Sequence, residues 1–257
     1  MRFSVLASGS KGNACYIETE NTRLLIDAGL SCRELIRRME LVGLQVSHLD
    51  AIIITHEHSD HIKGAGPISR KFNTTVYSNS STMSRCIGTL GKTGINNKLR
   101  TGESFKINDI TVETFAKDHD AVDPIGLTVS SNGSRLGILT DAGKSTPMLE
   151  DMLHGCTGVL LEFNHDVEML ENGPYPYYLK KRIRGSKGHL SNDQAGMLLK
   201  RLSNKKLCHV VLAHLSEVNN TPEKALAKAR ESLSECDMGN IPVHVSYQDY
   251  PCPILEV

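Results

Sequence analysis

Short apolar runs alternate with polar, glycine-containing segments along the chain, a pattern typical of strands and helices that follow one another. Apolar runs with β-branched or alternating residues predict strands at 2–8, 14–19, 22–27, 51–54, 75–78, 126–131, 135–140, 159–163, 210–212, 243–246 and 254–257, with one or two more between 99 and 115. Helical spacing predicts helices at 32–42, 62–72, 80–90, 146–153, 193–202 and 222–235. This succession predicts an α/β architecture.

Several predicted helices carry recognisable start signals. Ser80 and Ser81 are candidate caps of the helix at 80–90, and Ser191 is the expected cap of the helix that follows it. Pro222 stands where the first turn of a helix tolerates proline.

Two segments of the chain repeat one pattern. Leu25–Gly29 and Leu139–Gly143 each end a predicted hairpin strand with Asp-Ala-Gly and lead into a helix. The second hairpin turns at Asn132 and Gly133, a strong turn signal. The repeat predicts two related halves that face one another, although a match this short also arises by chance.

The densest chemistry follows the apolar run Ile52–Ile54, where His56, His58, Asp60 and His61 stand close together. Imidazoles and carboxylates are the usual ligands of zinc and other first-row divalent metals. In an extended or tightly turned segment, His56 and His58 can converge on one ion. Asp60 and His61 then point toward a second ion. The pattern predicts a two-metal site completed by residues from later in the chain. The alternative is a polar surface loop.

Four predicted strands end in a side chain that binds metals: His56, Asp141, His165 and His214. In α/β architectures, functional sites gather where strands end at one edge of a sheet. A single histidine at such a place also has a structural explanation, because it can bond to a backbone carbonyl. Four endings of this kind favour a shared site.

Composition narrows the class of protein. The 257 residues include 29 basic and 29 acidic side chains, so no global charge attracts nucleic acid or membrane. The seven cysteines are scattered, which favours a reduced intracellular chain over a disulfide framework. The first residues do not read as a signal peptide, and no apolar stretch is long enough to span a bilayer. We therefore expect a cytoplasmic protein without membrane contact.

The motifs, taken together, resemble the metallo-β-lactamase superfamily. The resemblance implies an αββα sandwich that spans 1–257 as one domain, with two similar halves and the metal site at the shared sheet edge. It assigns His56, His58 and His119 to the first metal. It assigns Asp60, His61 and His214 to the second metal, with Asp141 as the ligand that bridges the two. Asp27 matches a residue that orients the ligand loop.

The resemblance also implies the cofactors and the chemistry. Two divalent ions, zinc or manganese with iron possible, would share a hydroxide and hold it for attack on phosphorus. Asp60 is counted among the catalytic residues as well as the ligands. A bridging Asp141 is typical of the thioesterase and nuclease branches of the family.

His189 lies in the segment Gly188–Ser191, which resembles the tRNA 3′-processing nucleases and cyclic-phosphate phosphodiesterases of this fold. In those enzymes such a histidine protonates the leaving oxygen, so His189 is a candidate general acid or phosphate clamp. A helix-capping turn is the alternative. His165 is a further candidate, which either contacts the site or supports the ligands.

A narrower resemblance is to the YycJ/WalJ-like branch, whose features here are Ser8–Asn13, His119–Gly126, Asn164–Asp166 and Gly188–Asn192. That branch implies a 5′→3′ exonuclease on double-stranded DNA with a role in DNA repair. The basic residues before His189 are candidate DNA contacts: Lys180, Lys181, Arg182 and Arg184, beside three tyrosines. An ordinary solvated helix face has the same pattern.

Two other functions remain open on the sequence. A small-molecule hydrolase of the same fold, acting on a cyclic phosphodiester, lactone or thioester, needs only a pocket and no basic track. A metal-binding redox or scaffold protein is less compatible with His189 and with the absence of a flavin-type domain.

Overall fold

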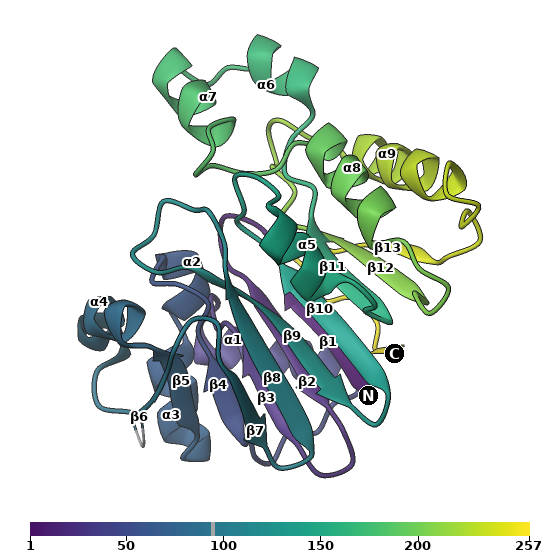
Figure 1. Cartoon of the computed structure of the whole chain (residues 1–257). Coiled ribbons are helices and arrows are strands. Elements are labelled where there is room, and N and C mark those ends of the chain that lie inside the picture. The colour runs from purple at the N-terminus through teal and green to yellow at the C-terminus, as the bar shows by residue number, and fades with distance from the viewer. Residues whose placement is uncertain (94–95) are drawn as a thin grey trace.

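The computed structural model describes residues 1–93 and 96–257, and in it two sheets pack face to face with helices on both outer sides (Figure 1). The first sheet has the order β14-β1-β2-β3-β4-β5-β6. Its strands are β1 (Arg2–Ala7), β2 (Ala14–Glu18), β3 (Arg23–Ile26), β4 (Ala51–Ile53), β5 (Thr75–Asn79), β6 (Asn96–Leu99) and β14 (Leu255–Glu256). The second sheet has the order β13-β12-β11-β10-β9-β8-β7. Its strands are β7 (Ser104–Ile107), β8 (Ile110–Ala116), β9 (Ile125–Ser131), β10 (Ser134–Leu139), β11 (Gly158–Glu162), β12 (His209–Ala213) and β13 (Val243–Val245).

Helices complete the outer layers. They are α1 (Cys32–Leu41), α2 (Ser59–Ile62), α3 (Ala65–Phe72), α4 (Ser80–Leu90), α5 (Pro147–Leu153), α6 (Val167–Asn172), α7 (Tyr177–Ile183), α8 (Asn192–Leu202) and α9 (Pro222–Ser234). One apolar cluster fills the space between the sheets, a second packs α1 to α4 on the first sheet, and a third packs α5, α8 and α9 on the second. The αββα sandwich predicted from the sequence is therefore confirmed.

The two sheets are built alike. In each, an antiparallel hairpin (β2 with β3, β9 with β10) is followed by parallel strands. Asp27 and Asp141 follow the hairpins, and both have a left-handed backbone, with φ of 57° and 55°. The short Asp-Ala-Gly repeat thus marks corresponding places in two similar halves.

Two local predictions differ from the structure. The predicted helix at 62–72 is two helices, α2 and α3, because the chain turns at Gly64, where an added Cβ would lie 2.0 Å from the Leu30 carbonyl oxygen. The cap of α4 is Asn79, whose side chain accepts a hydrogen bond from the Thr82 N–H, and not Ser80 or Ser81. Ser191 caps α8 as predicted, with a full capping box.

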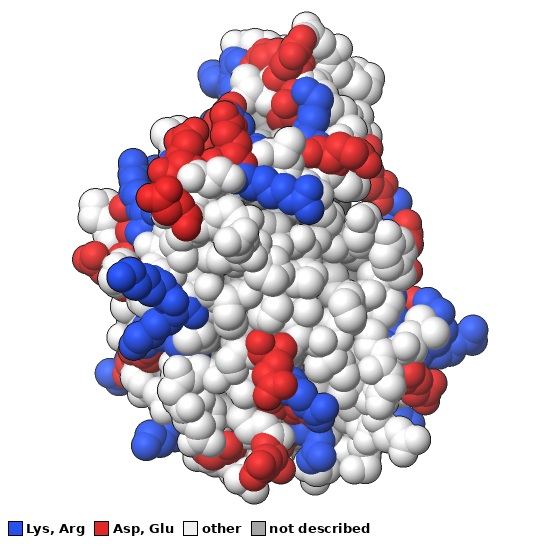
Figure 2. Space-filling view, turned by 90° about the vertical axis from the view of Figure 1, so that its right-hand side faces the viewer, with Lys and Arg blue, Asp and Glu red and all other residues white. Residues whose placement is uncertain are grey.

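The surface shows how charge is distributed. Acidic and basic side chains both gather toward the top of Figure 2, the end at which α6 and α7 lie in Figure 1, and a wide area below them is uncharged. Within the described part of the chain, no helix combines the length and the apolar character that a bilayer crossing requires.

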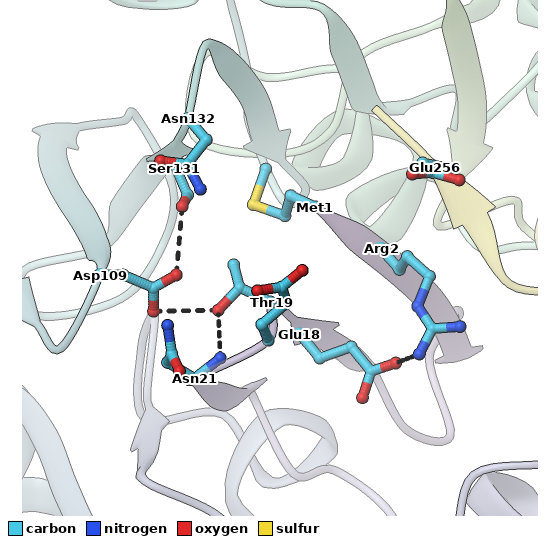
Figure 3. A pocket seen from close by; sticks show the side chains of 10 residues that line it. Met1, Arg2, Glu18, Thr19, Asn21, Asp109, Ser131, Asn132 and Glu256 are labelled. Carbon is cyan, nitrogen blue, oxygen red and sulfur yellow. Dashed lines mark hydrogen bonds and ion pairs between the residues drawn. The ribbon is translucent and has the colours of Figure 1, made fainter.

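The opposite end of the sandwich has a cavity of about 420 Å³ (Figure 3). Asp109, in the turn between β7 and β8, accepts hydrogen bonds there from the hydroxyls of Thr19, Thr22 and Ser131. These contacts join turns of both sheets, far from the strand ends described next.

Candidate metal centre

The predicted ligand residues meet at one end of the sandwich, where strands of both sheets finish. His56 and His58 follow β4, His119 follows β8, and His214 follows β12. His214 has a left-handed backbone with φ of 56°, as Asp27 and Asp141 do. Such a conformation is unfavourable for residues other than glycine and is concentrated at functional sites.

Four overlapping groups of side chains could each hold a metal ion, with ligand atoms within 4.8 Å of one another in each group. The groups are His56, His58 and His119; Asp60, His61 and His214; His56, His61 and Asp141; and Asp141, Glu162, His189 and His214. All seven residues predicted as ligands belong to them. Glu162 and His189 are additions.

In the first group, contacts at Nδ1 orient the rings of two histidines. Nδ1 of His56 lies 3.0 Å from the Thr55 hydroxyl, and Nδ1 of His119 lies 3.2 Å from the Gly188 carbonyl oxygen. The other nitrogen of His119 then lies 3.3 Å from Nδ1 of His58. Burial holds the pKa of His56 well below its ordinary value, so this imidazole is neutral and free to act as a ligand.

The second group lies on α2 and at the end of β12. Nε2 of His61 is 3.4 Å from Oδ2 of Asp60, and Nε2 of His214 is 3.9 Å from the same oxygen. The side-chain amide of Asn13 donates to this Asp60 oxygen at 3.1 Å and lies 3.0 Å from Nε2 of His61. The Ser8–Asn13 loop therefore supports the ligands directly.

Asp141 lies between the groups. Its Oδ2 is 3.1 Å from Nε2 of His61, and its Oδ1 is 3.3 Å from Nε2 of His214. Although burial opposes ionisation, the His214 and His61 side chains hold the pKa of Asp141 well below its ordinary value. Its position fits the bridging role that the sequence predicted.

Asp27 supports His61 from behind. Its Oδ2 is 2.7 Å from Nδ1 of His61, and its Oδ1 accepts the backbone N–H of Thr55 at 2.8 Å. A carboxylate on Nδ1 fixes the tautomer and leaves Nε2 as the ligand atom. The contact fits the orienting role that the sequence predicted for Asp27.

Glu162 was missed by the sequence reasoning. It is fully buried at the end of β11, with Oε1 2.7 Å from Nδ1 of His189 and 3.3 Å from Nδ1 of His214. Burial opposes its ionisation, but the neighbouring His189 lowers the pKa of Glu162 to about 2. The available signal was an acidic residue that ends the apolar run 159–161.

His165 lies outside the four ligand groups that the described residues form. It is buried and pairs with Ser191 in an isolated bridge, and its Nδ1 lies 3.4 Å from the Asn164 side-chain oxygen. Burial lowers the pKa of His165 to about 4. These contacts place His165 beside the start of α8, the helix that follows His189 in the chain.

The basic residues predicted as DNA contacts lie on and after α7. Arg182 forms an ion pair with Asp120 at 2.6 Å, and Asp120 is itself 3.3 Å from Nε2 of His119. Arg184 pairs with Glu171, and Lys180 donates to the Glu171 carbonyl oxygen at 2.6 Å. Lys181 has no ion pair within the described part of the chain.

The site fits divalent cations on three observations. Within the described residues, the buried atoms His56 Nε2, Asp141 Oδ2 and His214 Nε2 have no hydrogen-bond partner. Asp141 Oδ2 nevertheless lies 3.1 Å from His61 Nε2, and His214 Nε2 lies 3.3 Å from Asp141 Oδ1. These distances are close to the spacing of about 3.3 Å between ligands that bind one ion at about 2.0 Å.

The third observation is charge. Four carboxylates and one ammonium gather around the ligand atoms, and with neutral imidazoles their net formal charge is three negative: Asp27, Asp60, Asp141, Glu162 and Lys117. Although burial opposes their charged forms, the nearby carboxylates raise the pKa of His61 well above its ordinary value and that of His214 to about 10. Without metal these two imidazoles carry protons that compensate part of the negative charge, and divalent cations would replace those protons. The sandwich and its ligand groups define a protein that binds divalent metal.

Comparison with known proteins identifies the family. Residues 22–214 match the family described as the β-lactamase superfamily domain. The exodeoxyribonuclease YycJ of Bacillus anthracis is 36% identical over 241 residues, which cover 93% of this chain and 91% of that protein. The exodeoxyribonuclease WalJ of Streptococcus pneumoniae is 35% identical over 263 residues, covering 100% and 98%. This chain belongs to the metallo-β-lactamase superfamily, in the branch of YycJ and WalJ.

A solved structure agrees at the level of the fold. The metallo-β-lactamase fold protein YhfI of Bacillus subtilis superposes with a TM-score of 0.73 at 14% identity, covering 98% of both chains. At this identity the likeness concerns the fold alone.

Proposed function

We propose that this protein is a metal-dependent exodeoxyribonuclease that acts 5′→3′ on double-stranded DNA. The observation that carries the proposal is the pairing of His189 with Glu162 beside the metal-binding groups, which adds a proton donor to a site that binds divalent metal. Full-length similarity to two exodeoxyribonucleases supports the choice of substrate. The whole chain, 1–257, would act as one domain.

The metal site is proposed to hold two ions, zinc or manganese. The first ion would be bound by His56, His58 and His119, and the second by Asp60, His61 and His214. Asp141 would be shared by both ions. Two divalent cations would change the net charge of the site from three negative to one positive. A charge of this sign suits an anionic phosphodiester, whereas one cation would leave the site negative and repel it.

The chain's own residues would handle the proton and the phosphate. When bound, the ions would acidify a water molecule and neutralise charge on a phosphoryl oxygen. His189 is the proposed general acid: its Nδ1–H donates a hydrogen bond to Glu162, so Nε2 is the atom that can give a proton to the leaving oxygen. Glu162 positions both His189 and His214.

The DNA would approach along α7. Tyr177 and Tyr178 expose 70% and 73% of their surface there, and α7 buries none of its residues. Lys181 can meet phosphate without breaking an ion pair, whereas Arg182 must first release Asp120. Exposed aromatic and basic side chains beside a metal site are typical of nucleic-acid contacts.

The test is degradation of duplex DNA labelled at either the 5′ or the 3′ end, with zinc or manganese added to the full-length protein. Early release of the 5′ label as a mononucleotide is expected. Asp141→Asn serves as the inactive control. If the full-length protein with zinc or manganese cleaves neither duplex, the nuclease proposal is refuted.

A second candidate, a hydrolase of small phosphodiesters, is favoured by one observation. Two of the four predicted basic residues, Arg182 and Arg184, are already paired with Asp120 and Glu171, and Lys180 donates to a backbone carbonyl oxygen. Lys181→Glu separates the two functions, with Lys106→Glu, an exposed lysine on β7, as the matched control. Loss of DNA cleavage with retained hydrolysis of bis(p-nitrophenyl) phosphate supports the nuclease. Hydrolysis of the small ester without any DNA cleavage supports the alternative.

A further inference from the structure

A separate pocket of about 310 Å³ borders the metal centre on the side of His214. Its walls come from three segments: the start of the Ser8–Asn13 loop, residues 215–222, and the loop 246–250 that follows β13. The pocket is within the size range of small-ligand sites. None of the predicted site residues lines it.

Short contacts connect this pocket to the metal ligands. The backbone N–H of His214 donates to the Ser8 hydroxyl at 2.7 Å, and the backbone N–H of Ser8 donates to the Tyr247 carbonyl oxygen at 3.1 Å. Ser8 therefore contacts a proposed metal ligand on one side and the pocket wall on the other. A group bound in the pocket would therefore lie beside Leu215 and Ser8, the chain neighbour and the hydrogen-bond partner of the proposed ligand His214.

The pocket wall is held in place. The Gln248 side chain accepts the backbone N–H of Lys11 at 2.8 Å and donates to the Gly12 carbonyl oxygen at 3.1 Å. The buried Arg38 donates to the Gln248 carbonyl oxygen at 2.7 Å. A pocket whose loops are fixed in this way loses little conformational entropy when it binds a ligand.

The charges of the pocket exclude an anionic ligand. Its only cationic side chain within the described residues is Lys11, which is paired with Glu217 at 2.7 Å. Asp249 adds a second carboxylate. A phosphate would meet repulsion here, so the pocket suits an uncharged group.

The aromatic side chains indicate a planar ligand. Tyr247 and Tyr250 stack with their ring centroids 4.4 Å apart, and Tyr250 is 52% exposed. Tyr250 also lines the pocket, so its ring is accessible to a ligand there. Planar bases stack on such rings whatever their sequence.

Several polar side chains of the pocket already form hydrogen bonds within the protein. The Asn220 amide donates to the carbonyl oxygens of Phe163 and Asn164, and the Ser246 hydroxyl donates to the Leu212 carbonyl oxygen at 2.7 Å. Both ends of the Gln248 side chain are also engaged. Few groups remain to read the edge of a base, so recognition would depend on stacking and would not distinguish the four bases.

We propose that this pocket binds the nucleobase of a substrate nucleotide next to the scissile phosphate, by stacking on Tyr250 and without base preference. The proposal rests on the proposed nuclease function and adds a position at which the enzyme holds the strand. It explains how a chain with no net charge can retain DNA without a long basic track.

The test compares duplexes that carry a tetrahydrofuran abasic residue at the first or the second nucleotide from the 5′ end with normal duplexes. For the wild-type protein, one abasic position should raise KM about tenfold, whereas exchanging the four bases there should change KM by no more than about twofold. Tyr250→Leu should raise KM for the normal duplex about tenfold and remove the abasic effect, with kcat retained. Tyr250→Phe keeps the ring and should behave as wild type.

Equal abasic penalties in wild-type protein and Tyr250→Leu would overturn the pocket proposal while leaving the nuclease proposal intact. If the wild-type protein cleaves no DNA, the nuclease proposal fails on its own, and the pocket is examined by saturation-transfer NMR with deoxyadenosine. Transfer to the base that is lost in Tyr250→Leu supports the pocket. Transfer that is absent in wild-type protein, or unchanged in the variant, refutes it.

Discussion

At the scale of single residues, the metal centre depends on carboxylates placed behind histidines. Asp27 fixes the ring of His61, and Glu162 lies behind both His189 and His214. Each carboxylate is buried, so its negative charge acts at short range and with little screening. These contacts decide which ring nitrogen faces the site.

Glu162→Gln should lower kcat for DNA by about 10- to 100-fold, because the neutral amide no longer places a negative charge beside Nδ1 of His189. Metal content should be measured alongside, because Glu162 also contacts the proposed ligand His214. Hydrolysis of a p-nitrophenyl ester should fall much less, since its leaving group needs no proton. His189→Ala is the matched control, and an equal loss on both substrates in both variants would argue against the proton-donor role.

Asp141→Asn should remove more activity than any other single ligand change, at least about 100-fold, because both proposed ion positions lose a negative ligand. Elemental analysis should find less bound metal than in the wild-type protein. Asp109→Asn, which changes a hydrogen-bonded aspartate at the far end of the sandwich, should leave metal content unchanged. Normal turnover with two bound metals in Asp141→Asn would contradict the bridging role.

At the scale of elements, each Asp-Ala-Gly turn requires its glycine for close packing. A Cβ on Gly29 would lie 1.7 Å from the Asp60 carbonyl oxygen, and one on Gly143 would lie 2.3 Å from the Ser186 carbonyl oxygen. Gly29 thus lets the hairpin end approach α2, which carries two of the proposed ligands. Gly143 does the same for the segment before His189.

Gly29→Ala should therefore destabilise the protein by about 3 kcal/mol or more and weaken metal binding, because the backbone of Asp60 must move. Gly88→Ala is the control: Gly88 lies exposed inside α4 with open space around it, so alanine should stabilise by about 0.5–1 kcal/mol. Urea denaturation with metal analysis measures both effects. A Gly29→Ala protein as stable as wild type would refute the packing argument.

The helix α1 is tied to the first sheet by a buried arginine. Arg38 donates to the Leu6 carbonyl oxygen at 2.9 Å and to Glu34 at 2.7 Å. Arg37 and then Arg38 hold the pKa of Glu34 down to about 2. Because the folded pKa is depressed, this carboxylate stabilises the fold above its unfolded pKa of about 4.3, and the stabilisation is lost as pH falls toward 2.

Glu34→Gln should therefore cost about 1 kcal/mol at pH 7, and its difference from wild type should vanish between about pH 4.3 and 2. Glu40→Gln, on the same helix and without an ion pair within the described residues, should match wild type at every pH. Urea midpoints measured across this range provide the comparison. A Glu34→Gln deficit that persists at pH 2 would contradict it.

At the scale of the whole molecule, the site exists only where the two sheets meet. The first sheet supplies Asp27, His56 and His58, and the second supplies Asp141 and His214. Asp27 and Asp141 are buried carboxylates from different sheets, and bound cations would attract both. Metal binding should therefore also stabilise the contact between the sheets.

Removal of metal by a chelator should lower Tm by about 5–10 °C, the shift expected when a ligand bound at 100 times its Kd is lost from a protein of this size. Asp141→Asn should show a much smaller shift, because it holds less metal at the start. Scanning calorimetry before and after dialysis measures the change. An unchanged Tm in the wild-type protein after complete metal removal would contradict the link between metal and sheet contact.

The sequence by itself determined most of the elements and the ligand types. Strand and helix periods, the Asn132-Gly133 turn and the Asp-Ala-Gly repeat are local signals, and the residues that carry them are adjacent in the chain. The ligand motif after β4 is local in the same sense. For these features a pattern of neighbouring residues carries enough information.

Only the tertiary structure decided which distant side chains act together. Glu162 was overlooked because its role depends on His189 and His214, which lie 27 and 52 positions away and meet it across the site. The sequence likewise predicted Arg182 as a free basic side chain, whereas folding pairs it with Asp120. A charge pattern along the chain does not show which partner folding brings near. The Tyr247–Tyr250 pocket depends on contacts between the two ends of the chain. Long-range packing fixes such contacts, because burial and charge compensation are satisfied in space and not along the sequence.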